Sequence, residues 1–340
     1  MKLRGAISGF GEVAAKAHLA GWRTREDVTL GVIHDPIAER RHEAIRLIKN
    51  VRVYDDLELM LDGEAPDFVD IASPPALHGA AARTALNAGA HVLVEKPLCL
   101  SLAEFDEVAA VARARQRVLM CVHNWKFAPA YARARSLVDE GRIGSVRSVS
   151  LERLRVEPAG MGGPGAVWRT LGASGGGILI DHGWHVFYLM QWLMGGELPC
   201  AVAATLSNNL DGVEQAAEIH VTFGAGRTAH ANLSWRAGQR RTHATIVGTN
   251  GSLEIGTERL VLTEGHRPPQ ELLVQDIPDD SYHSAWFSGV AAAFEGAISA
   301  GPDSTITRAN LVEARTALAL IVAARVSAKN RGSLTDIAAA

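Results

Sequence analysis

The first 122 residues alternate between short apolar segments, typical of buried strands, and longer segments with helical periodicity. The apolar segments lie at residues 3–7, 28–33, 51–54, 67–72, 90–94 and 118–122. Strands that alternate with helices of about 10 to 15 residues pair in parallel through right-handed crossovers. The pattern therefore predicts an α/β fold with a doubly wound parallel sheet, a Rossmann domain, over residues 1–122.

A glycine turn follows the first of these strands. The segment from Ser8 to Ala14 reads GxGxxA between a strand and a helix, which is the context that a dinucleotide fingerprint requires. The first glycine permits a tight turn, and the second lets the backbone approach a pyrophosphate at the helix N-terminus. We therefore expect a cofactor site for NAD, or alternatively NADP, that includes Gly9, Phe10, Gly11, Glu12 and Val13.

Asp35 comes at the end of the second strand. A carboxylate there typically binds the ribose hydroxyls of NAD and repels the 2′-phosphate of NADP. Arg40 and Arg41 follow closely and keep NADP open as the alternative. Asp35 followed by Pro36 is also a common helix start, with an N-cap and then proline. The two roles are compatible, and we expect Asp35 and Arg40 to lie at the cofactor.

The strand from residue 90 ends in Glu95-Lys96-Pro97. A lysine at the carboxyl end of a parallel strand lies where open α/β sheets bind their ligands, and proline fixes the backbone after it. Taken alone, the same residues are also typical of a strand that ends in solvent.

After residue 122 the strand–helix alternation stops and strand patterns predominate. We expect strands at 146–156, 201–207, 216–223, 228–235 and 242–247, with hairpin turns at 224–226 and 249–251. Helices are expected at 129–140, 178–193, 283–300 and 307–330, the last two covering one face of the sheet. This predicts a second, α+β domain over residues 123–340 with a large, mainly antiparallel, open-faced sheet. Its uncovered face is expected to form a homodimer or homotetramer.

Three glycines, 175–177, precede the helix that carries Asp181 and His185. These two residues are four apart on one helical face, so the carboxylate can fix the imidazole tautomer and raise its basicity. That arrangement suits removal of a proton from an alcohol, although an ordinary helical Asp–His pair remains the alternative. A metal site formed by Asp181, His182, His185 and His78 is disfavoured because consecutive ligands do not share a helical face, and no metal is expected.

Bulk composition narrows the choice of partner. The net charge of -3 offers no basic stripe for nucleic acid or anionic lipid, so we expect no nucleic-acid or membrane partner. Cys99, Cys121 and Cys200 are widely spaced without a CxxC motif, which fits a reducing cytoplasm. No apolar run has the length of a signal peptide or a membrane span. We expect a cytoplasmic protein with a small-molecule ligand.

Taken together, these motifs resemble the Gfo/Idh/MocA family, which includes glucose–fructose oxidoreductase and inositol dehydrogenase. The resemblance rests on the GxGxxA turn, on Glu95-Lys96-Pro97 and on Gly-Gly-Gly-x3-Asp-x3-His. Ser73-Pro74-Pro75 with His78 is also similar to the family's pattern. So is Asn124-Trp125-Lys126-Phe127, in which Lys126 stands where arginine is commoner.

The resemblance implies a two-domain NAD(P)-dependent oxidoreductase that acts on a carbinol carbon of a sugar, a polyol or a related cyclic alcohol. It implies that Lys96 contacts both substrate and cofactor, often next to a cis peptide bond, and that Glu95 steadies it. Asp181 would bind the substrate and His185 would be catalytic. The implied cofactor residues also include Ser73, Pro74, His78, Glu95, Lys96 and Asn124, and the implied substrate residues are Lys96, Asn124, Trp168, Arg169, Asp181 and His185.

Substrate specificity is expected in the loop at 157–172, which contains Met161, Pro164, Trp168 and Arg169. The alternative function is a non-catalytic regulator that senses dinucleotide and sugar on the same fold. Such a sensor has no chemical need for Lys96, Asp181 and His185 together, which favours the enzyme.

Overall fold

The computed structural model describes residues 2–158, 168–172, 175–256, 259–274 and 282–337. These residues form two compact units. The first contains residues 2–124 and 282–314, and the second contains the other described residues. The sequence placed everything after residue 122 in the second domain, whereas the structure groups residues 282–314 with the N-terminal unit.

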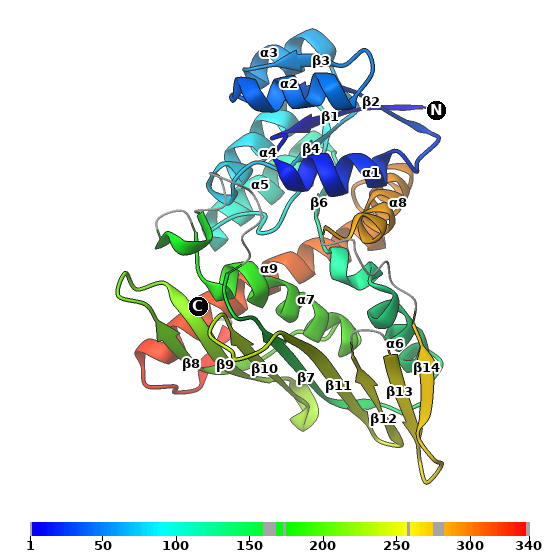
Figure 1. Cartoon of the computed structure of the whole chain (residues 1–340), viewed down its shortest axis with the longest axis vertical. Coiled ribbons are helices and arrows are strands. Elements are labelled where there is room, and N and C mark those ends of the chain that lie inside the picture. The colour runs from blue at the N-terminus through cyan, green and yellow to red at the C-terminus, as the bar shows by residue number, and fades with distance from the viewer. Residues whose placement is uncertain (1, 159–167, 173–174, 257–258, 275–281, 338–340) are drawn as a thin grey trace. The chain divides into compact units, whose positions relative to one another are not determined.

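The first unit contains a six-stranded parallel sheet with the strand order β3-β2-β1-β4-β5-β6, and Figure 1 labels β1, β2, β3, β4 and β6. The predicted parallel α/β sheet is therefore confirmed. β1 pairs with β2 on one side and with β4 on the other, so the strand order reverses there and a ligand-binding crevice is expected at the carboxyl ends of β1 and β4. The strands are β1 (Leu3–Ser8), β2 (Val28–His34), β3 (Arg52–Tyr54), β4 (Phe68–Ile71), β5 (His91–Val94) and β6 (Leu119–Cys121).

Helices connect these strands, and α5 (Leu102–Arg115) shows how the sequence sets their limits. Ser101 is the N-cap and its Oγ accepts the backbone N–H of Glu104 at 3.2 Å, while Gln116 closes the helix in the left-handed conformation. Phe105 and Val108 lie on its buried face. The other helical segments are η1 (Ala14–His18, a π-helix), α1 (Leu19–Trp22), α2 (Ala38–Leu47), α3 (Leu57–Glu64), η2 (Pro75–Leu77), α4 (His78–Asn87) and η3 (Asn124–Phe127).

Helix α8 (Ser284–Ala300) packs against η1 and α1 in the first unit. The ring of Phe287 stacks on His18 with centroids 3.9 Å apart, and a Cβ on Gly21 would lie only 2.6 Å from the Phe287 ring. The missing side chain at Gly21 is what allows this close approach. The expectation that α8 covers the sheet of the second domain is therefore wrong.

The second unit contains a nine-stranded sheet with the order β14-β13-β12-β11-β7-β10-β9-β8-β15. Among the strands that the structure describes in this sheet, only β7 and β10 pair in parallel, so the sheet is mainly antiparallel, as predicted. The predicted turns at 224–226 and 249–251 connect β9 to β10 and β11 to β12. The strands are β7 (Val146–Leu154), β8 (Ala201–Asn208), β9 (Glu214–Thr222), β10 (Thr228–Ser234), β11 (Arg241–Gly248), β12 (Gly251–Ile255), β13 (Arg259–Glu264), β14 (Gln270–Leu273) and β15 (Thr335–Asp336); the last four were not predicted.

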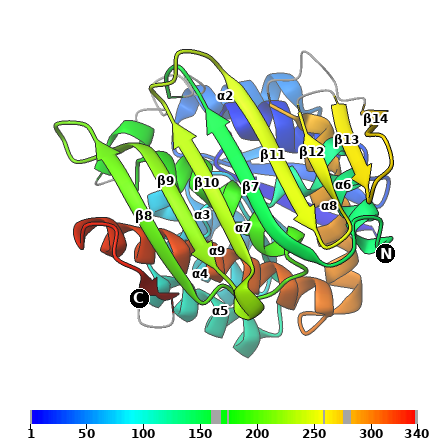
Figure 2. The ribbon, with the colours of Figure 1, turned by 90° about the horizontal axis from the view of Figure 1, so that it is seen from below.

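One face of this sheet is covered by helices. α6 (Pro129–Asp139) packs on β12 and β13, and α7 (Trp184–Leu193) packs on β7. The last part of α9 (Thr305–Lys329) runs along β8, where Ser327 Oγ accepts the backbone N–H of Ala204 at 2.9 Å. Figure 2 shows the other face of the strands without a helix in front of it. The sheet is therefore open-faced. Within the described residues, no helix is both long and apolar enough to cross a membrane.

Candidate active site

The predicted dinucleotide turn lies between β1 and η1. Gly9 has φ of +90°, and a Cβ there would come within 2.5 Å of the backbone nitrogen of Ser73, so only glycine fits without strain. Its N–H donates to the carbonyl of His34 at 2.8 Å. At Gly11, among the described residues and apart from Gly11 itself, its chain neighbours and the nearby helix backbone, no atom lies within 4 Å of the position a Cβ would take. The turn is thus held against β4 while its tip keeps room for a close-lying ligand.

The carboxylate of Asp35 accepts hydrogen bonds from the backbone at this turn. Oδ2 accepts the backbone N–H of Phe10 at 2.7 Å, and Oδ1 accepts the N–H of Ile37 at 2.9 Å. The side chain is buried. Asp35 therefore orders both the glycine turn and the start of the next helical segment, a structural role that ribose binding would add to. Arg41 donates to the Asp35 carbonyl at 2.8 Å, whereas Arg40 pairs with Glu43 on α2.

Glu12 and Val13 lie at the start of the helical segment after the turn. Val13 precedes η1 as its N-cap residue. Glu12 accepts the hydroxyl of Tyr282 at 2.7 Å and pairs with Lys16. Tyr282 comes from the segment just before α8, and no sequence motif indicated that it would reach the glycine turn.

Lys96 follows β5 next to a cis Lys96–Pro97 bond, which confirms the geometry that the family resemblance implies. Its backbone N–H donates to Glu95 Oε2 at 2.9 Å. Glu95 Oε1 in turn lies 3.1 Å from Nε2 of His18, and Nδ1 of His18 lies 2.9 Å from Asp70. This Asp70–His18–Glu95 chain was not predicted. The chain holds Glu95 in place, and Glu95 in turn positions the backbone of Lys96.

The charge on His18 follows from this chain. His18 is fully buried. Burial alone would lower its pKa, but the carboxylates of Asp70 and Glu95 outweigh burial and raise the pKa to about 9. Burial likewise opposes ionisation of Glu95, yet the contact with His18 leaves the pKa of Glu95 lowered. Both shifts describe one ion pair, in which a buried imidazolium stabilises the carboxylate next to Lys96.

His78 ties the segment after β4 to the segment after β5. Its Nε2 lies 2.7 Å from the carbonyl of Ser73 and its Nδ1 lies 2.6 Å from the carbonyl of Pro97. Burial lowers the pKa of His78, and the two carbonyls oppose that effect. The sequence predicted that His78 lies at the cofactor. In the structure, the imidazole of His78 contacts the backbone carbonyls of Ser73 and Pro97 and so links the two segments.

Two buried side-chain oxygens in the first unit have no hydrogen-bond partner among the described residues. They are Ser73 Oγ, just after β4 and next to Pro74, and Asn124 Oδ1, at the start of η3. Buried polar atoms are nearly always satisfied, so an unsatisfied one signals a missing partner. Both belong to the predicted cofactor set, and together with the room at Gly11 they fit a dinucleotide bound along the carboxyl ends of β1 and β4.

In the second unit, the glycines at 175–177 fold back on the segment that carries Trp168 and Arg169. A Cβ on Gly176 would come within 2.7 Å of the carbonyl oxygens of Trp168, Arg169 and Leu171. The turn brings Arg169 Nε to 3.3 Å from Asp181 Oδ1, and both side chains are buried. The guanidinium also lies 4.7 Å from the centre of the Trp168 ring. Three predicted substrate residues therefore lie together. Residues 159–167 of the predicted specificity loop, including Met161 and Pro164, lie outside the described residues.

Asp181 lies in the π-helix η6 (Leu179–Gly183), and His185 lies in the first turn of α7. The His185 ring stacks on Trp125 with centroids 4.6 Å apart and an angle of 10° between the planes. Its Nδ1 lies 3.0 Å from the hydroxyl of Tyr188, and that hydroxyl accepts the backbone N–H of Trp125. Trp125 and Tyr188 therefore orient the imidazole of His185. The sequence predicted that Asp181 orients it, and a contribution of Asp181 stays a prediction.

His182 contacts a different neighbour. Its Nδ1 lies 3.2 Å from Nε1 of Trp235 and 3.3 Å from Asp181 Oδ2. Because an indole N–H can only donate, Nδ1 of His182 accepts there. His182 is thus a packed residue beside Asp181 rather than a second candidate base.

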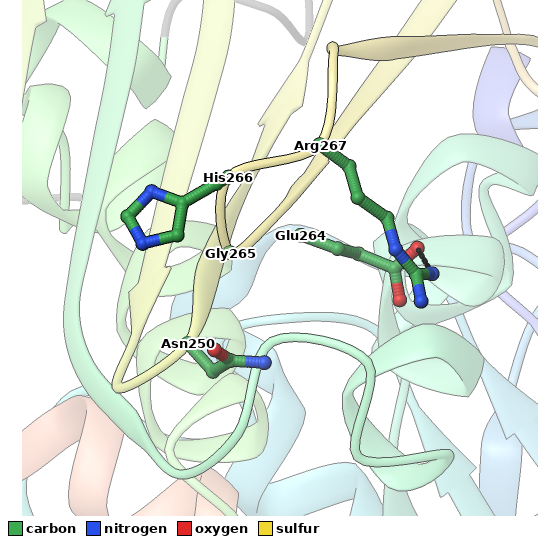
Figure 3. A pocket seen from close by; sticks show the side chains of 5 residues that line it. All are labelled: Asn250, Glu264, Gly265, His266 and Arg267. Carbon is green, nitrogen blue, oxygen red and sulfur yellow. Dashed lines mark ion pairs between the residues drawn. The ribbon is translucent and has the colours of Figure 1, made fainter.

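A surface hollow of about 370 Å³ lies elsewhere in the second unit, at the turns of two hairpins (Figure 3). Glu264 forms ion pairs there with Arg142 and Arg267. None of the predicted site residues lines the hollow, which is lined by Asn250, Glu264, Gly265, His266 and Arg267. It is therefore not the candidate active site.

Comparison with known protein families matches both units. Residues 3–123 match an oxidoreductase family with an NAD-binding Rossmann fold, and residues 131–254 match the GFO/IDH/MocA C-terminal domain. The chain belongs to the Gfo/Idh/MocA family. Its N-terminal unit is accordingly an NAD-binding domain, and the unsatisfied oxygens of Ser73 and Asn124 and the room at Gly11 are compatible with such a cofactor.

Individual relatives and one solved structure are similar to this chain. D-glucoside 3-dehydrogenase of Escherichia coli (strain K12) is 32% identical over 193 residues, which is 57% of this chain and 54% of that relative. The match thus spans about half the length of that enzyme. The putative oxidoreductase YceM of Salmonella typhimurium is 30% identical over 283 residues, covering 81% of this chain and 82% of the relative. A crystal structure of an Agrobacterium radiobacter oxidoreductase with NAD+, L-tartaric acid and magnesium covers 100% of this chain and 99% of that chain, with a TM-score of 0.87 at 20% identity, a likeness of fold.

Proposed function

We propose that this protein is an NAD-dependent dehydrogenase that acts on a secondary alcohol of a sugar, a polyol such as an inositol, or a related cyclic alcohol. The observation that carries the proposal is a buried, oriented His185 that follows, four residues later on the same helical segment, the buried Asp181 paired with Arg169. A packed imidazole and a paired carboxylate suit recognition and deprotonation of a hydroxyl group. The family membership and the similarity to a D-glucoside dehydrogenase support the same substrate class.

Each residue has a proposed task. His185 removes the hydroxyl proton through Nε2, with Nδ1–H donated to the Tyr188 oxygen. Asp181, steadied by Arg169, binds a neighbouring substrate hydroxyl, and Lys96 stabilises the developing alkoxide. NAD, when bound, supplies the redox chemistry by accepting the hydride from the carbinol carbon. Asp35 and the glycine turn favour NAD over NADP, with Arg40 and Arg41 keeping NADP as the alternative cofactor.

We also propose that the protein forms a homodimer or homotetramer through the open face of the nine-stranded sheet. The support is that large face, over which no helix of the described part of the chain lies. A monomeric mass by light scattering at micromolar concentration would contradict this. A cytoplasmic location is proposed as well, supported by three cysteines that are all unpaired.

The function is tested by incubating the purified protein with NAD and a panel of sugars and polyols, and reading the absorbance of the reduced cofactor. His185→Ala serves as the inactive comparison. Turnover of at least one cyclic polyol or sugar by the wild type and not by His185→Ala is the expected result. Tight binding of both dinucleotide and sugar without any turnover would instead identify a sensor and refute the enzyme.

A further inference from the structure

Two histidines and a glutamate converge on the open face of the nine-stranded sheet. β9 and β10 pair antiparallel with His220 directly opposite His230 and with Glu218 opposite Asn232. Glu218 and His220 are two residues apart on one strand, so they point to the same face. The hairpin therefore brings together three potential metal ligands: Glu218, His220 two residues later, and His230 ten residues after that.

The distances fit a metal site better than a hydrogen-bonded cluster. Nε2 of His220 and Nε2 of His230 each lie 3.6 Å from Oε1 of Glu218, which is too long for a hydrogen bond. A tetrahedral zinc ion with nitrogen and oxygen ligands at about 2.1 Å holds neighbouring ligand atoms about 3.4 Å apart. All three ligand atoms lie within 4.8 Å of one another, so small side-chain rotations complete the geometry.

The site is rigid, and in the single chain its side chains are exposed on the same sheet face through which we propose that chains associate. β9 and β10 lie inside the sheet, between β7 and β8, so the backbone of all three ligands is fixed by strand pairing on both sides. The side chains of Glu218 and His220 are 62% and 63% exposed, and that of His230 is 33% exposed. The two imidazole rings, with centroids 4.6 Å apart, are tilted by 40° rather than stacked, which leaves their nitrogens turned toward the carboxylate.

We propose that Glu218, His220 and His230 bind a divalent transition-metal ion, with zinc as the best fit. Two imidazoles and one carboxylate form a three-ligand zinc set whose fourth position takes water or another donor. Imidazole nitrogen selects zinc, copper, nickel or cobalt over magnesium and calcium, which prefer all-oxygen shells. This site does not involve the residues assigned to alcohol oxidation.

The test uses the full-length protein without a polyhistidine tag, stripped of metal with a chelator. Cobalt(II) is titrated in while the visible absorption of tetrahedral cobalt is recorded, and zinc is then added to displace it. Calorimetric titration with zinc gives stoichiometry and affinity, and magnesium serves as the non-binding ion. His220→Asn and His230→Asn remove one ligand each, and His243→Asn is the matched control. His243 lies on the same face, because its strand partner Glu152 lies opposite Asn232 on β10.

One zinc ion per chain is expected, with binding weakened by about tenfold or more in His220→Asn and in His230→Asn. Binding should be unchanged in His243→Asn. Absence of zinc binding by the wild type would overturn the proposal and leave the cluster as a solvated pair of histidines beside a glutamate. Zinc binding that survives in both ligand variants, or that falls equally in the control, would overturn it as well.

Discussion

His18 should make the stability of the N-terminal unit depend on pH. Its pKa is about 9 in the folded protein against an ordinary value of 6.5. Because the folded pKa is the higher one, the contribution to stability is fully present below pH 6.5 and is lost as pH rises toward 9. A difference of that size corresponds to roughly 3 kcal/mol of unfolding free energy.

The assay compares urea unfolding of the wild type and His18→Gln between pH 6 and pH 10. At pH 6 the variant leaves Asp70 and Glu95 buried without their cation, so it should be less stable than the wild type by roughly 3 kcal/mol or more. At pH 10 the wild-type imidazole is also neutral, and the two proteins should converge. His42→Gln, which changes an exposed histidine on α2, should follow the wild type at every pH.

A stability difference between wild type and His18→Gln that stays constant across this range would refute the buried imidazolium. If the variant does not fold, the wild type alone still decides the question, because its own unfolding free energy must fall by roughly 3 kcal/mol between pH 6.5 and pH 9.

Three further predictions follow from contacts in the two units. Asp35→Ser should shift the ratio of kcat/KM for NAD and NADP toward NADP by about one to two powers of ten, corresponding to roughly 1.5 to 3 kcal/mol; an unchanged ratio would mean that the carboxylate only orders the backbone. Gly176→Ala should lower stability by roughly 1 to 3 kcal/mol in thermal unfolding, while Gly238→Ala, where nothing lies within 4 Å, should not. Tyr188→Phe should lower turnover about tenfold with little change in NAD affinity, because His185 loses the partner of Nδ1; full activity would exclude that orienting role.

The N-terminal sheet could be predicted from sequence because most of its strands carry buried apolar residues. After His91, β5 is an apolar run, β4 is apolar except for Asp70, and the last four residues of β1 are buried. The structure extends or shortens the predicted strands by only one or two residues. Helix α5 begins and ends where Ser101 and Gln116 cap it.

The domain to which α8 belongs could not be predicted from its own residues. The apolar stripe of α8 shows that one face of the helix is buried, but it does not identify the element against which that face packs. The signal lay elsewhere, in Gly21 on α1, whose missing side chain admits Phe287. Strand β14 could not be predicted for a different reason, since it is short and mostly exposed and carries little of the alternation that identifies a strand. Strands β12 and β13 do alternate, so the sequence contained a signal for them.

The residues of the candidate site that lie in local sequence motifs were predicted. The residues that reach the site from distant parts of the chain were missed. Lys96, Asp181 and His185 stand in recognisable patterns. His18 and Asp70 are 52 residues apart, and no spacing rule joins them before the sheet is built. Tyr188 was within reach, because it lies three residues after His185 on the same helix.

The Glu218–His220–His230 cluster was also within reach of the sequence. Both strands and the turn at 224–226 were predicted, and the register that a hairpin imposes sets which residues face each other. The metal ligands weighed from the sequence were Asp181, His182, His185 and His78, none of which lies on either of these strands.

The pH dependence of alcohol oxidation in His185→Ala and Lys96→Ala tests the central claim most directly. If His185 is the base, wild-type kcat/KM should rise with pH through a single ionisation in the range where histidines titrate. His185→Ala should lose that rise and about a hundredfold or more in turnover while NAD affinity stays nearly intact. Lys96→Ala should keep the rise at a lower turnover, and Lys96→Arg should not restore activity. Persistence of the rise in His185→Ala together with its loss in Lys96→Ala would reverse the two roles, and unchanged turnover in both variants would contradict the assignment of the active site.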